Sequence, residues 1–336
     1  MKIIKLTEYV YTASFARIHP SYLEGFPQRE KYLLAGFASL DVHWYKHPLL
    51  SDAAVIAQSR DQLKAYIKQE QIDFILFDNP ISALLLDEEL MRTAIFDCCD
   101  WYLDYFHCEF GADADSSALQ QGLQLAIADC PYCIFQSTTI RDWYLNERGG
   151  RPVMAELILP NGFDAEFFYP GTSKLKFDRP TVLFAGKLGQ WYQGLRTVAA
   201  ALPEGWQLIL VGDGPCREEY ASLPAVHCTG RLSLPEVADY IRAATVCVMP
   251  VDDCSPIATS EYLACGKPVV HMGPRINWMI QDGVNGYLAG PDVAQWRHQL
   301  ITAAQASPDI LDKARATAQS WLTLQQQLKQ WLEQLQ

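Results

Sequence analysis

Short apolar runs alternate with helix-like segments along almost the whole chain, in two series. The runs of the first series are IIKL near the N-terminus, DVHWY, IDFILF, TAIFD and CIFQS. The second series starts after residue 175 and contains TVLFAG, WQLILVGD, AVHCTG, TVCVMPV, KPVVHM and NGYLAG. Strands that alternate with helices are typical of βαβ units around a parallel sheet. We therefore predict an α/β protein with two doubly wound sheets.

A turn-rich stretch between the two series, from Pro160 to Lys174, has no periodic pattern. The chain of 336 residues is also longer than a single core usually serves. We expect a first domain at 1–171 and a second at 172–316. The remaining segment, 317–336, has its large apolar side chains on one helical stripe and mostly glutamine opposite, so we expect a helix that crosses back to the first domain and packs across both domains. The stripe consists of Trp321, Leu324, Leu328, Trp331, Leu332 and Leu335.

Composition limits which binding partners and which cellular compartment we expect for this protein. The formal net charge is −12, which disfavours nucleic acid and allows at most peripheral contact with an anionic membrane. No run approaches the roughly 20 apolar residues of a transmembrane helix, and the N-terminus lacks a signal-peptide pattern. The ten cysteines have no regular spacing. These features favour a cytoplasmic protein with reduced thiols.

An acidic pair stands in the second half of the chain. Asp253-Cys-Ser-Pro-Ile-Ala-Thr-Ser-Glu261 is followed by Tyr-Leu-Ala-Cys-Gly266-Lys-Pro268-Val-Val. We expect a strand that ends at Val251, a loop, and a helix that opens near Ser255, whose free N–H groups attract phosphate. The segment resembles the E-x7-E motif of glycosyltransferase family 4. Read without that resemblance, Asp253 would cap a helix and Glu261 would be a solvated helix charge.

Four further segments resemble motifs of the same family, in the family's order. They are ILPNGFD from Ile158 to Asp164, FAGKL from Phe184 to Leu188, VGDGP from Val211 to Pro215, and QDGVNGYL from Gln281 to Leu288. The resemblance covers the second domain and its entry. It implies the GT-B fold, in which two Rossmann-like domains face a cleft, and transfer of a sugar from a nucleotide-diphosphate donor.

The resemblance also assigns roles to individual residues. It implies that Glu261 binds the ribose hydroxyls, that Asp253 lies near the transferred sugar, and that Lys187 offers positive charge to the diphosphate. A carboxylate suits the first two tasks because it accepts hydroxyl hydrogen bonds. The complete donor-binding set is Gly186, Lys187, Gly212, Arg231, Asp253, Ser255, Pro256, Ile257 and Glu261. An ordinary surface lysine is the alternative for Lys187.

Two departures from the family pattern concern binding. The family has a lysine-glycine pair where this chain has Gln193-Gly194, and Arg196 is a substitute cation. The glycine-rich loop that many relatives carry after the first strand is also absent, and the stretch from Thr7 to Thr12 stands in its place.

Ile95-Phe-Asp97-Cys-Cys-Asp100-Trp101 resembles a segment of a teichuronic-acid-type subgroup. It makes Asp100 a candidate to orient or activate an acceptor hydroxyl, or else a helix-capping residue.

Other signals are discounted. The GDGPCR turn lacks the third glycine of a dinucleotide fingerprint, so no NAD is expected. Cys130-Pro-Tyr-Cys133 follows a helix and precedes a strand, which is the reverse of a redox site, and it has no zinc-binding partner motif. We predict no metal and no cofactor. His271 is interpreted as a satisfied strand-end histidine.

The sequence thus predicts a glycosyltransferase with Asp100, Asp253 and Lys187 as catalytic residues. Resemblance implies retention of configuration without a metal, and a glycan, lipid-linked molecule or protein as acceptor, as in polysaccharide biosynthesis. Two alternatives stay open. One is a non-catalytic GT-B protein that binds a partner, and the other is a nucleotide-sugar epimerase or phosphorylase on the same scaffold.

Overall fold

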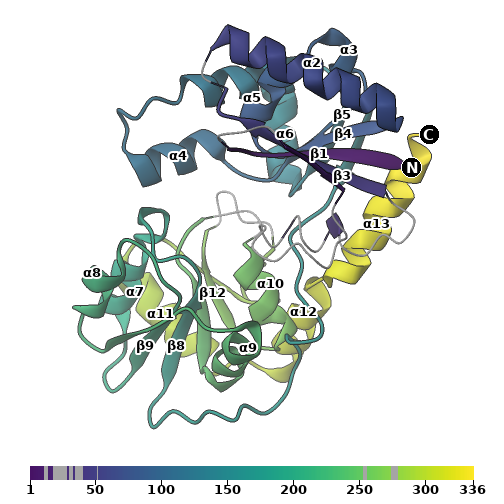
Figure 1. Ribbon diagram of the computed structural model, residues 1–336. Helices are drawn as coiled ribbons and strands as arrows, with labels where there is room; N and C mark the ends of the chain where they lie inside the picture. Colours follow the sequence, from purple (N-terminus) through teal and green to yellow (C-terminus); the bar gives the residue numbers. More distant parts are fainter. Residues whose placement is uncertain are drawn as a thin grey trace. The chain divides into compact units, whose positions relative to one another are not determined.

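The computed structural model describes residues 1–10, 14–17, 29, 33–34, 41–50, 52–252, 256–273 and 279–336. The chain forms two compact units. The first consists of Met1–Pro160 with Leu322–Gln336, and the second of Asn161–Trp321 (Figure 1). The segment just after Pro160 belongs to the second unit, where Phe168 is buried in the core and Asn161 O accepts a hydrogen bond from Ser260 Oγ.

The first unit is built on a seven-stranded sheet in the order β2-β3-β1-β4-β5-β6-β7. Neighbouring strands are parallel except β2, which runs antiparallel to β3. The strands are β1 (Lys2–Val10), β2 (Ser14–Arg17), β3 (Asp41–Pro48), β4 (Phe74–Phe77), β5 (Ala94–Cys98), β6 (Tyr132–Phe135) and β7 (Ala155–Ile158). The five predicted strands are confirmed. The two that the pattern missed, β2 and β7, lie at the edges, where β7 is incompletely buried and so needs no continuous apolar run.

Helices cover this sheet and include the C-terminal segment. They are α2 (Ala53–Glu70), the 3₁₀ helix η2 (Pro80–Leu85), α3 (Glu88–Met91), α4 (Tyr102–Phe110), α5 (Ser117–Asp129), α6 (Thr138–Glu147) and α13 (Trp321–Gln334). Five of the six stripe residues of α13 are buried, as predicted, and Leu335 is half-buried. The sequence pattern also predicts a helix from Arg29 to Leu40, and this segment lies largely outside the described residues.

The second unit contains six parallel strands in the order β10-β9-β8-β11-β12-β13. They are β8 (Thr181–Ala185), β9 (Gln207–Val211), β10 (Val226–Gly230), β11 (Val246–Met249), β12 (Val269–Met272) and β13 (Tyr287–Ala289). All six were predicted. Sequence order reverses between the neighbouring strands β8 and β11, which makes the sheet doubly wound.

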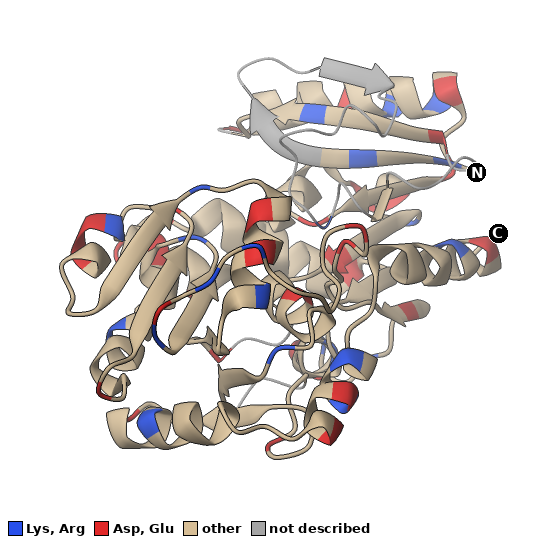
Figure 2. Ribbon diagram, turned by 90° about the horizontal axis from the view of Figure 1, so that it is seen from below, with Lys and Arg blue, Asp and Glu red and all other residues tan. Residues whose placement is uncertain are grey.

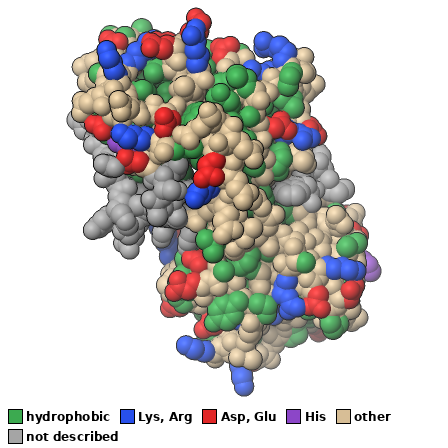
Figure 3. Space-filling view, turned by 90° about the vertical axis from the view of Figure 1, so that its right-hand side faces the viewer, with side chains coloured by type: hydrophobic (Ala, Val, Ile, Leu, Met, Phe, Trp, Pro, Cys, Tyr) green, Lys and Arg blue, Asp and Glu red, His purple; other side chains and the backbone are tan. Residues whose placement is uncertain are grey.

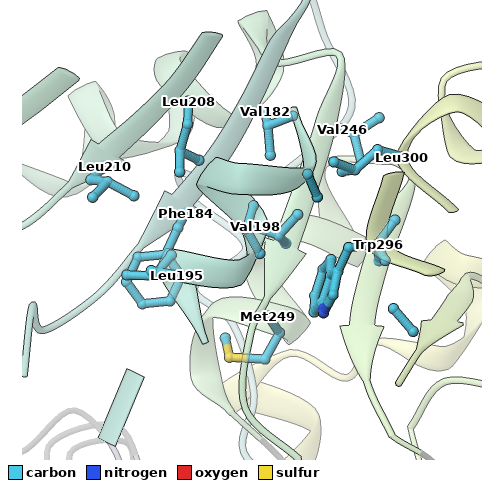
Figure 4. Close-up of a cluster of buried hydrophobic side chains, with 14 of the residues drawn as sticks. Val182, Phe184, Leu195, Val198, Leu208, Leu210, Val246, Met249, Trp296 and Leu300 are labelled. Atoms are coloured by element: carbon cyan, nitrogen blue, oxygen red, sulfur yellow. The ribbon is translucent and has the colours of Figure 1, made fainter. Parts of the chain in front are cut away.

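Helices pack on both faces of this sheet. They are η3 (Gln190–Tyr192), α7 (Leu195–Ala201), α8 (Arg217–Ala221), α9 (Leu234–Ala243), α10 (Ile257–Ala264), α11 (Val293–Ala303) and α12 (Pro308–Thr317). Alternate strand residues divide between two cores, since Val182 and Phe184 belong to one and Leu183 and Ala185 to the other. Figure 4 shows the first core, to which β8, β9 and β11 contribute side chains from the sheet and α7 and α11 contribute side chains that include Trp296.

Local capping and surface charge follow the sequence. Ser233 and Glu236, three positions apart in the sequence, form a capping box that opens α9, where the backbone N–H of Ser233 donates to Glu236 Oε2 at 2.8 Å. Acidic and basic residues are interspersed on helices and loops (Figure 2), and the face drawn in Figure 3 mixes charges of both signs with hydrophobic side chains. In the part of the chain that the structure describes, no helix combines the length and hydropathy needed to cross a bilayer.

Candidate functional site

The loops that follow β8, β9, β10, β11 and β12 gather at the carboxyl edge of the second sheet. In open parallel sheets, ligands bind at this edge, beside the point where strand order reverses. Here that point lies between β8 and β11. Most of the predicted donor-binding residues belong to these loops or to the helix α10 that follows β11.

The backbones of the loops after β8 and β9 are in close contact. Gly186 N donates to Val211 O at 2.9 Å, and Gly212 N donates to Gly230 O at 3.0 Å. A Cβ atom on Gly212 would lie 1.9 Å from Gly186 O, and the φ of Gly212 is +146°. Both observations require glycine at 212. The two glycines therefore let the two strand ends and their loops approach each other closely.

The loop after β8 also crosses the loop after β11. A Cβ atom on Gly194 would lie 2.1 Å from Pro250 O, so this crossing requires a glycine. Gln193 stands just before it, at the end of η3, with an exposed side chain. The glycine of the family's lysine-glycine pair thus has a packing role in this chain, while the position of its lysine offers only an amide.

The predicted cations differ in their surroundings. Lys187 is exposed in the loop after β8, and Arg231 is exposed directly after β10, where no described residue forms an ion pair with it. Arg196 instead pairs with Glu219 through Nε and Oε1 at 2.5 Å and through Nη2 and Oε2 at 2.9 Å. Its guanidinium is thereby held at α8, which argues against Arg196 as a substitute phosphate cation.

Helix α10 begins at Ile257, with Pro256 as its N-cap residue. The prediction that it opens near Ser255 agrees within the usual uncertainty of helix ends. Asp253 and Ser255 themselves lie outside the described residues, so their predicted roles are untested. Pro256 is buried and Ile257 is half-buried at the start of the helix. The first turn of such a helix carries unpaired N–H groups and the positive end of the helix dipole.

Glu261 is a buried carboxylic acid in the middle of α10. Its exposed fraction is 7%, and no described residue donates a hydrogen bond to its carboxylate. Burial, and secondarily the negative charge of Asp164, raises the pKa of Glu261 to about 8. The solvated-charge alternative for Glu261 is therefore wrong. Hydroxyl donors from a ligand would favour the ionised form of this carboxylate.

The raised pKa of Glu261 predicts how stability depends on pH. Its ordinary pKa of 4.5 applies to the unfolded chain and its pKa of about 8 to the folded one. Between these values the folded protein keeps a proton that the unfolded chain has lost, so the free energy of unfolding falls as pH rises from 4.5 to 8. The loss is at most about 5 kcal/mol. Glu261→Gln should therefore become increasingly more stable than the wild type towards pH 9.

Urea denaturation of both proteins at pH 5, 7 and 9 measures this difference. The matched control is Glu218→Gln, because Glu218 is an exposed acid of the same unit. The control should shift the free energy of unfolding equally at each pH. Parallel stability curves for Glu261→Gln and the wild type would contradict the proposed burial cost.

Asp100 follows β5 at the carboxyl edge of the first sheet. It is half-buried, and its Oδ1 accepts a hydrogen bond from Trp101 N at 2.8 Å. Two ion pairs at the same sheet were not predicted: buried Lys5 with half-buried Asp78 at 2.5 Å, and Arg29 with Asp97, both buried, at 2.9 Å. A lysine inside the apolar run IIKL signalled the first pair. Nothing in the local sequence signalled the second.

The discounted residues fit structural roles with one exception. Cys130 and Cys133 are fully buried, and burial raises the pKa of Cys130 well above its ordinary value, which disfavours a reactive thiolate. His271 lies at the end of β12, where its Nδ1 bonds Met272 O at 2.6 Å. Its Nε2 has no partner among the described residues, so the prediction that this histidine is satisfied is wrong for one ring nitrogen. Burial lowers the pKa of His271 to about 4.

The structure does not test the prediction that the protein needs no metal or cofactor. In the described ranges, no group of three histidine, cysteine, aspartate or glutamate side chains is arranged to hold a metal ion. Residues 253–255 and 274–278, which follow β11 and β12 in the sequence, are outside the described ranges. Independence of a metal therefore stays a prediction.

Residues 179–306 match the family model described as "Glycosyl transferases group 1". No curated protein sequence matches the chain. Among solved structures, HepE from Anabaena in complex with UDP-glucose is 18% identical, with a TM-score of 0.71 over 99% of this chain and 100% of HepE. Sucrose-phosphate synthase from Thermosynechococcus elongatus is 17% identical, with a TM-score of 0.71 over 99% of this chain and 98% of the synthase.

The apo form of the lipopolysaccharide outer core galactosyltransferase WaaB is 14% identical, with a TM-score of 0.66 over 100% of both chains. At such identities these matches establish the fold, which is the predicted pair of Rossmann-like units. The narrower resemblance to a teichuronic-acid-type subgroup stays a prediction.

Proposed function

We propose that this chain, a glycosyltransferase of the GT-B fold whose second unit matches the group 1 family, transfers a sugar from a nucleoside diphosphate to an acceptor hydroxyl. The observation that carries the proposal is Glu261. It is a buried carboxylic acid without a described donor, on the helix that follows the strand-order reversal. Two adjacent hydroxyls of a ribose would supply the missing donors and would favour the ionised carboxylate.

The other donor-binding residues are assigned from the resemblance, and those that the structure describes belong to the loops at the same edge of the sheet or to α10. Gly186 and Gly212 let the backbone approach the nucleotide. Lys187 and the start of α10 at Ile257 face the diphosphate and stabilise the charge that develops on it as it leaves. Arg231 is a second cation for the base or phosphate side. For Asp253 and Ser255, which lie outside the described residues, the proposal keeps the predicted roles of contacting the transferred sugar and the phosphates.

The donor and the acceptor are proposed at different levels of detail. HepE binds UDP-glucose in its crystal structure, which makes UDP-glucose the first donor to test here. On the acceptor side, Asp100 would orient or activate a hydroxyl of a glycan, lipid-linked molecule or protein. Retention of configuration, independence of a metal and action in the cytoplasm are parts of the same proposal.

The first test is a thermal-shift screen of the wild-type protein with UDP, GDP, ADP, dTDP and CMP. A ligand that binds only the folded state stabilises it by mass action, so one diphosphate should raise the melting temperature by several degrees at concentrations about 100 times its dissociation constant. CMP is the control that lacks the second phosphate. If none of the five shifts the melting temperature, the donor site is wrongly assigned.

A non-catalytic binding protein is the second candidate function. It is favoured by the exposed amide at Gln193, where the family has a lysine, together with the engagement of Arg196 by Glu219. Fewer cations at the diphosphate would weaken stabilisation of the leaving group. Release of UDP from UDP-glucose in the presence of mixed acceptors distinguishes the two functions, because a binding protein would show the thermal shift without product.

A further inference from the structure

A cavity at the amino edge of the first sheet lies apart from the residues discussed above. It is formed by the three connections that enter β5, β6 and β7, and its volume is about 650 Å³. Small-molecule sites in proteins range from roughly 300 to 1,000 Å³. Asp100 follows the carboxyl end of β5, so this cavity lies at the opposite edge of the same sheet. No described donor-binding residue lines it.

The inner lining of the cavity is apolar. Leu86 and Met91, from the connection that enters β5, are 5% and 6% exposed. Leu125 of α5 and Tyr132 at the start of β6 are half-buried. Met154, just before β7, is exposed at the mouth. Methionine side chains are flexible and adapt to ligands of different shape. The lining therefore fits an apolar molecular body.

The size of the apolar surface favours a small molecule as the occupant. A stable protein partner would cover about 800 Å² of this chain, usually around apolar side chains that are exposed before binding. Among the lining residues, all of which the structure describes, Met154 is the one exposed large hydrophobic side chain. The other apolar side chains are recessed, where a small ligand can reach them and a flat protein surface cannot.

The charges at the mouth are paired with one exception. Lys64 Nζ lies 2.5 Å from Asp87 Oδ2, and Arg92 Nη2 lies 2.9 Å from Glu88 Oε1. Asp129 is exposed and also lines the cavity, and no described residue forms an ion pair or a hydrogen bond with its carboxylate. Because the two pairs cancel, the mouth keeps the negative charge of Asp129.

The position of Asp129 adds to this negative charge. Asp129 is the last residue of α5, where the backbone carbonyls form the negative end of the helix dipole, and the last turn contains no basic residue. Arg148 donates to Ile127 O and to Cys130 O, but it forms no ion pair with Asp129. A cation beside Asp129 would thus be attracted by the carboxylate and by the helix end together. The cavity combines an apolar interior with a mouth that selects positive charge.

We propose that this cavity binds a small organic cation, in which an ammonium group is joined to an apolar body. The apolar body lies against Met91 and Leu125, and the ammonium group lies at Asp129. The site uses neither the donor-binding residues nor Asp100, so the proposal does not rest on sugar transfer. It involves binding alone, with no bond made or broken.

Three ligands with one apolar body and different charges test the proposal. They are 4-phenylbutylammonium, 4-phenylbutanol and 4-phenylbutyrate, each titrated into the full chain labelled with carbon-13 at the methionine methyl groups. The signals of Met91 and Met154, assigned by substitution with leucine, should shift, while that of Met249 in the core of the second unit should not. The ammonium should bind at least about threefold more tightly than the alcohol, and the carboxylate most weakly. Raising NaCl from about 50 to about 500 mM should narrow these differences.

Asp129→Asn tests the residue that selects the charge. Asp129 is exposed, so the substitution should leave the fold intact. The dissociation constant of the ammonium should rise to that of the alcohol, while binding of the alcohol stays unchanged. The matched control is Glu147→Gln, because Glu147 is also an exposed acid at the last position of a helix, α6, but does not line the cavity. This control should keep the preference for the ammonium.

Three results would overturn the proposal. They are equal affinities of the wild type for the three ligands, a preference for the ammonium that persists in Asp129→Asn, and unchanged Met91 and Met154 signals in the presence of the ammonium. None of these measurements uses a nucleotide. If the wild type binds the ammonium but no nucleoside diphosphate, the proposed function fails and this proposal stands. The reverse pair of results overturns this proposal and leaves the proposed function intact.

Discussion

Glu261→Ala is expected to weaken binding of the nucleoside diphosphate at least about 100-fold. Two hydrogen bonds from ribose hydroxyls to a buried carboxylate contribute roughly 1.5–3 kcal/mol each, and part of this offsets the cost of ionising the acid. The fold should persist because the substitution removes a buried group that no described residue satisfies. Isothermal titration with UDP and the rate of UDP release from UDP-glucose measure the two effects.

The affinity for UDP-glucose should also depend on pH, in the direction opposite to stability. The free acid has a pKa of about 8, and hydroxyl donors favour the ionised form, so binding releases a proton below that pH. Affinity should rise with pH up to about 8 and then level off. Glu261→Gln should bind weakly and with little pH dependence. The control for Glu261→Ala is Glu218→Ala, a substitution of an exposed residue of α8. This control should bind UDP as the wild type does. Equal affinity of Glu261→Ala and the wild type would remove Glu261 from the site.

Gly212→Ala is expected to have the largest effect on folding. Its Cβ would lie 1.9 Å from Gly186 O, a backbone atom that cannot rotate away. The ends of β8 and β9 would have to separate, which breaks the bonds from Gly186 N to Val211 O and from Gly212 N to Gly230 O. We expect the free energy of unfolding to fall by about 3 kcal/mol or more, with loss of the UDP-induced thermal shift.

Gly205→Ala is the matched control for this effect. Gly205 also has a positive φ, +79°, but a Cβ there would meet nothing within 4 Å. It should cost about 1–2 kcal/mol, which is the strain of the left-handed backbone alone, and should leave UDP binding intact. Urea denaturation of both variants makes the comparison. If Gly212→Ala costs no more than Gly205→Ala, the close approach of the two loops is not what requires the glycine.

The strand pattern could be read from the sequence because buried parallel strands are continuous apolar runs. The runs TVLFAG and WQLILVGD form β8 and β9, and a glycine directly follows each strand. The capping box at Ser233 and the buried stripe of α13 were also predictable, since both depend on spacing within one helix. The edge strand β7 was missed because it is incompletely buried and needs no such run.

The electrostatic state of the site was decided by tertiary structure. The sequence placed Glu261 on a helix after a strand, but its burial and its pKa of about 8 come from packing and from Asp164, nearly a hundred residues earlier. Arg196 looked available for phosphate and is instead held by Glu219, 23 positions later. Arg29 meets Asp97 across 68 positions and reaches Pro160 across 131. A linear pattern contains no signal for such pairs.

The sequence by itself determined the two parallel sheets, the helix that carries Glu261 and the glycines at the strand ends, because these depend on periodicity and on backbone conformation over a few residues. Only the tertiary structure decided which cations remain exposed, why Gly194 must be a glycine beside Pro250, and which carbonyls Arg29 holds. The physical reason is that burial, charge pairing and close contact depend on distance in space, which the folded chain sets between residues far apart in sequence.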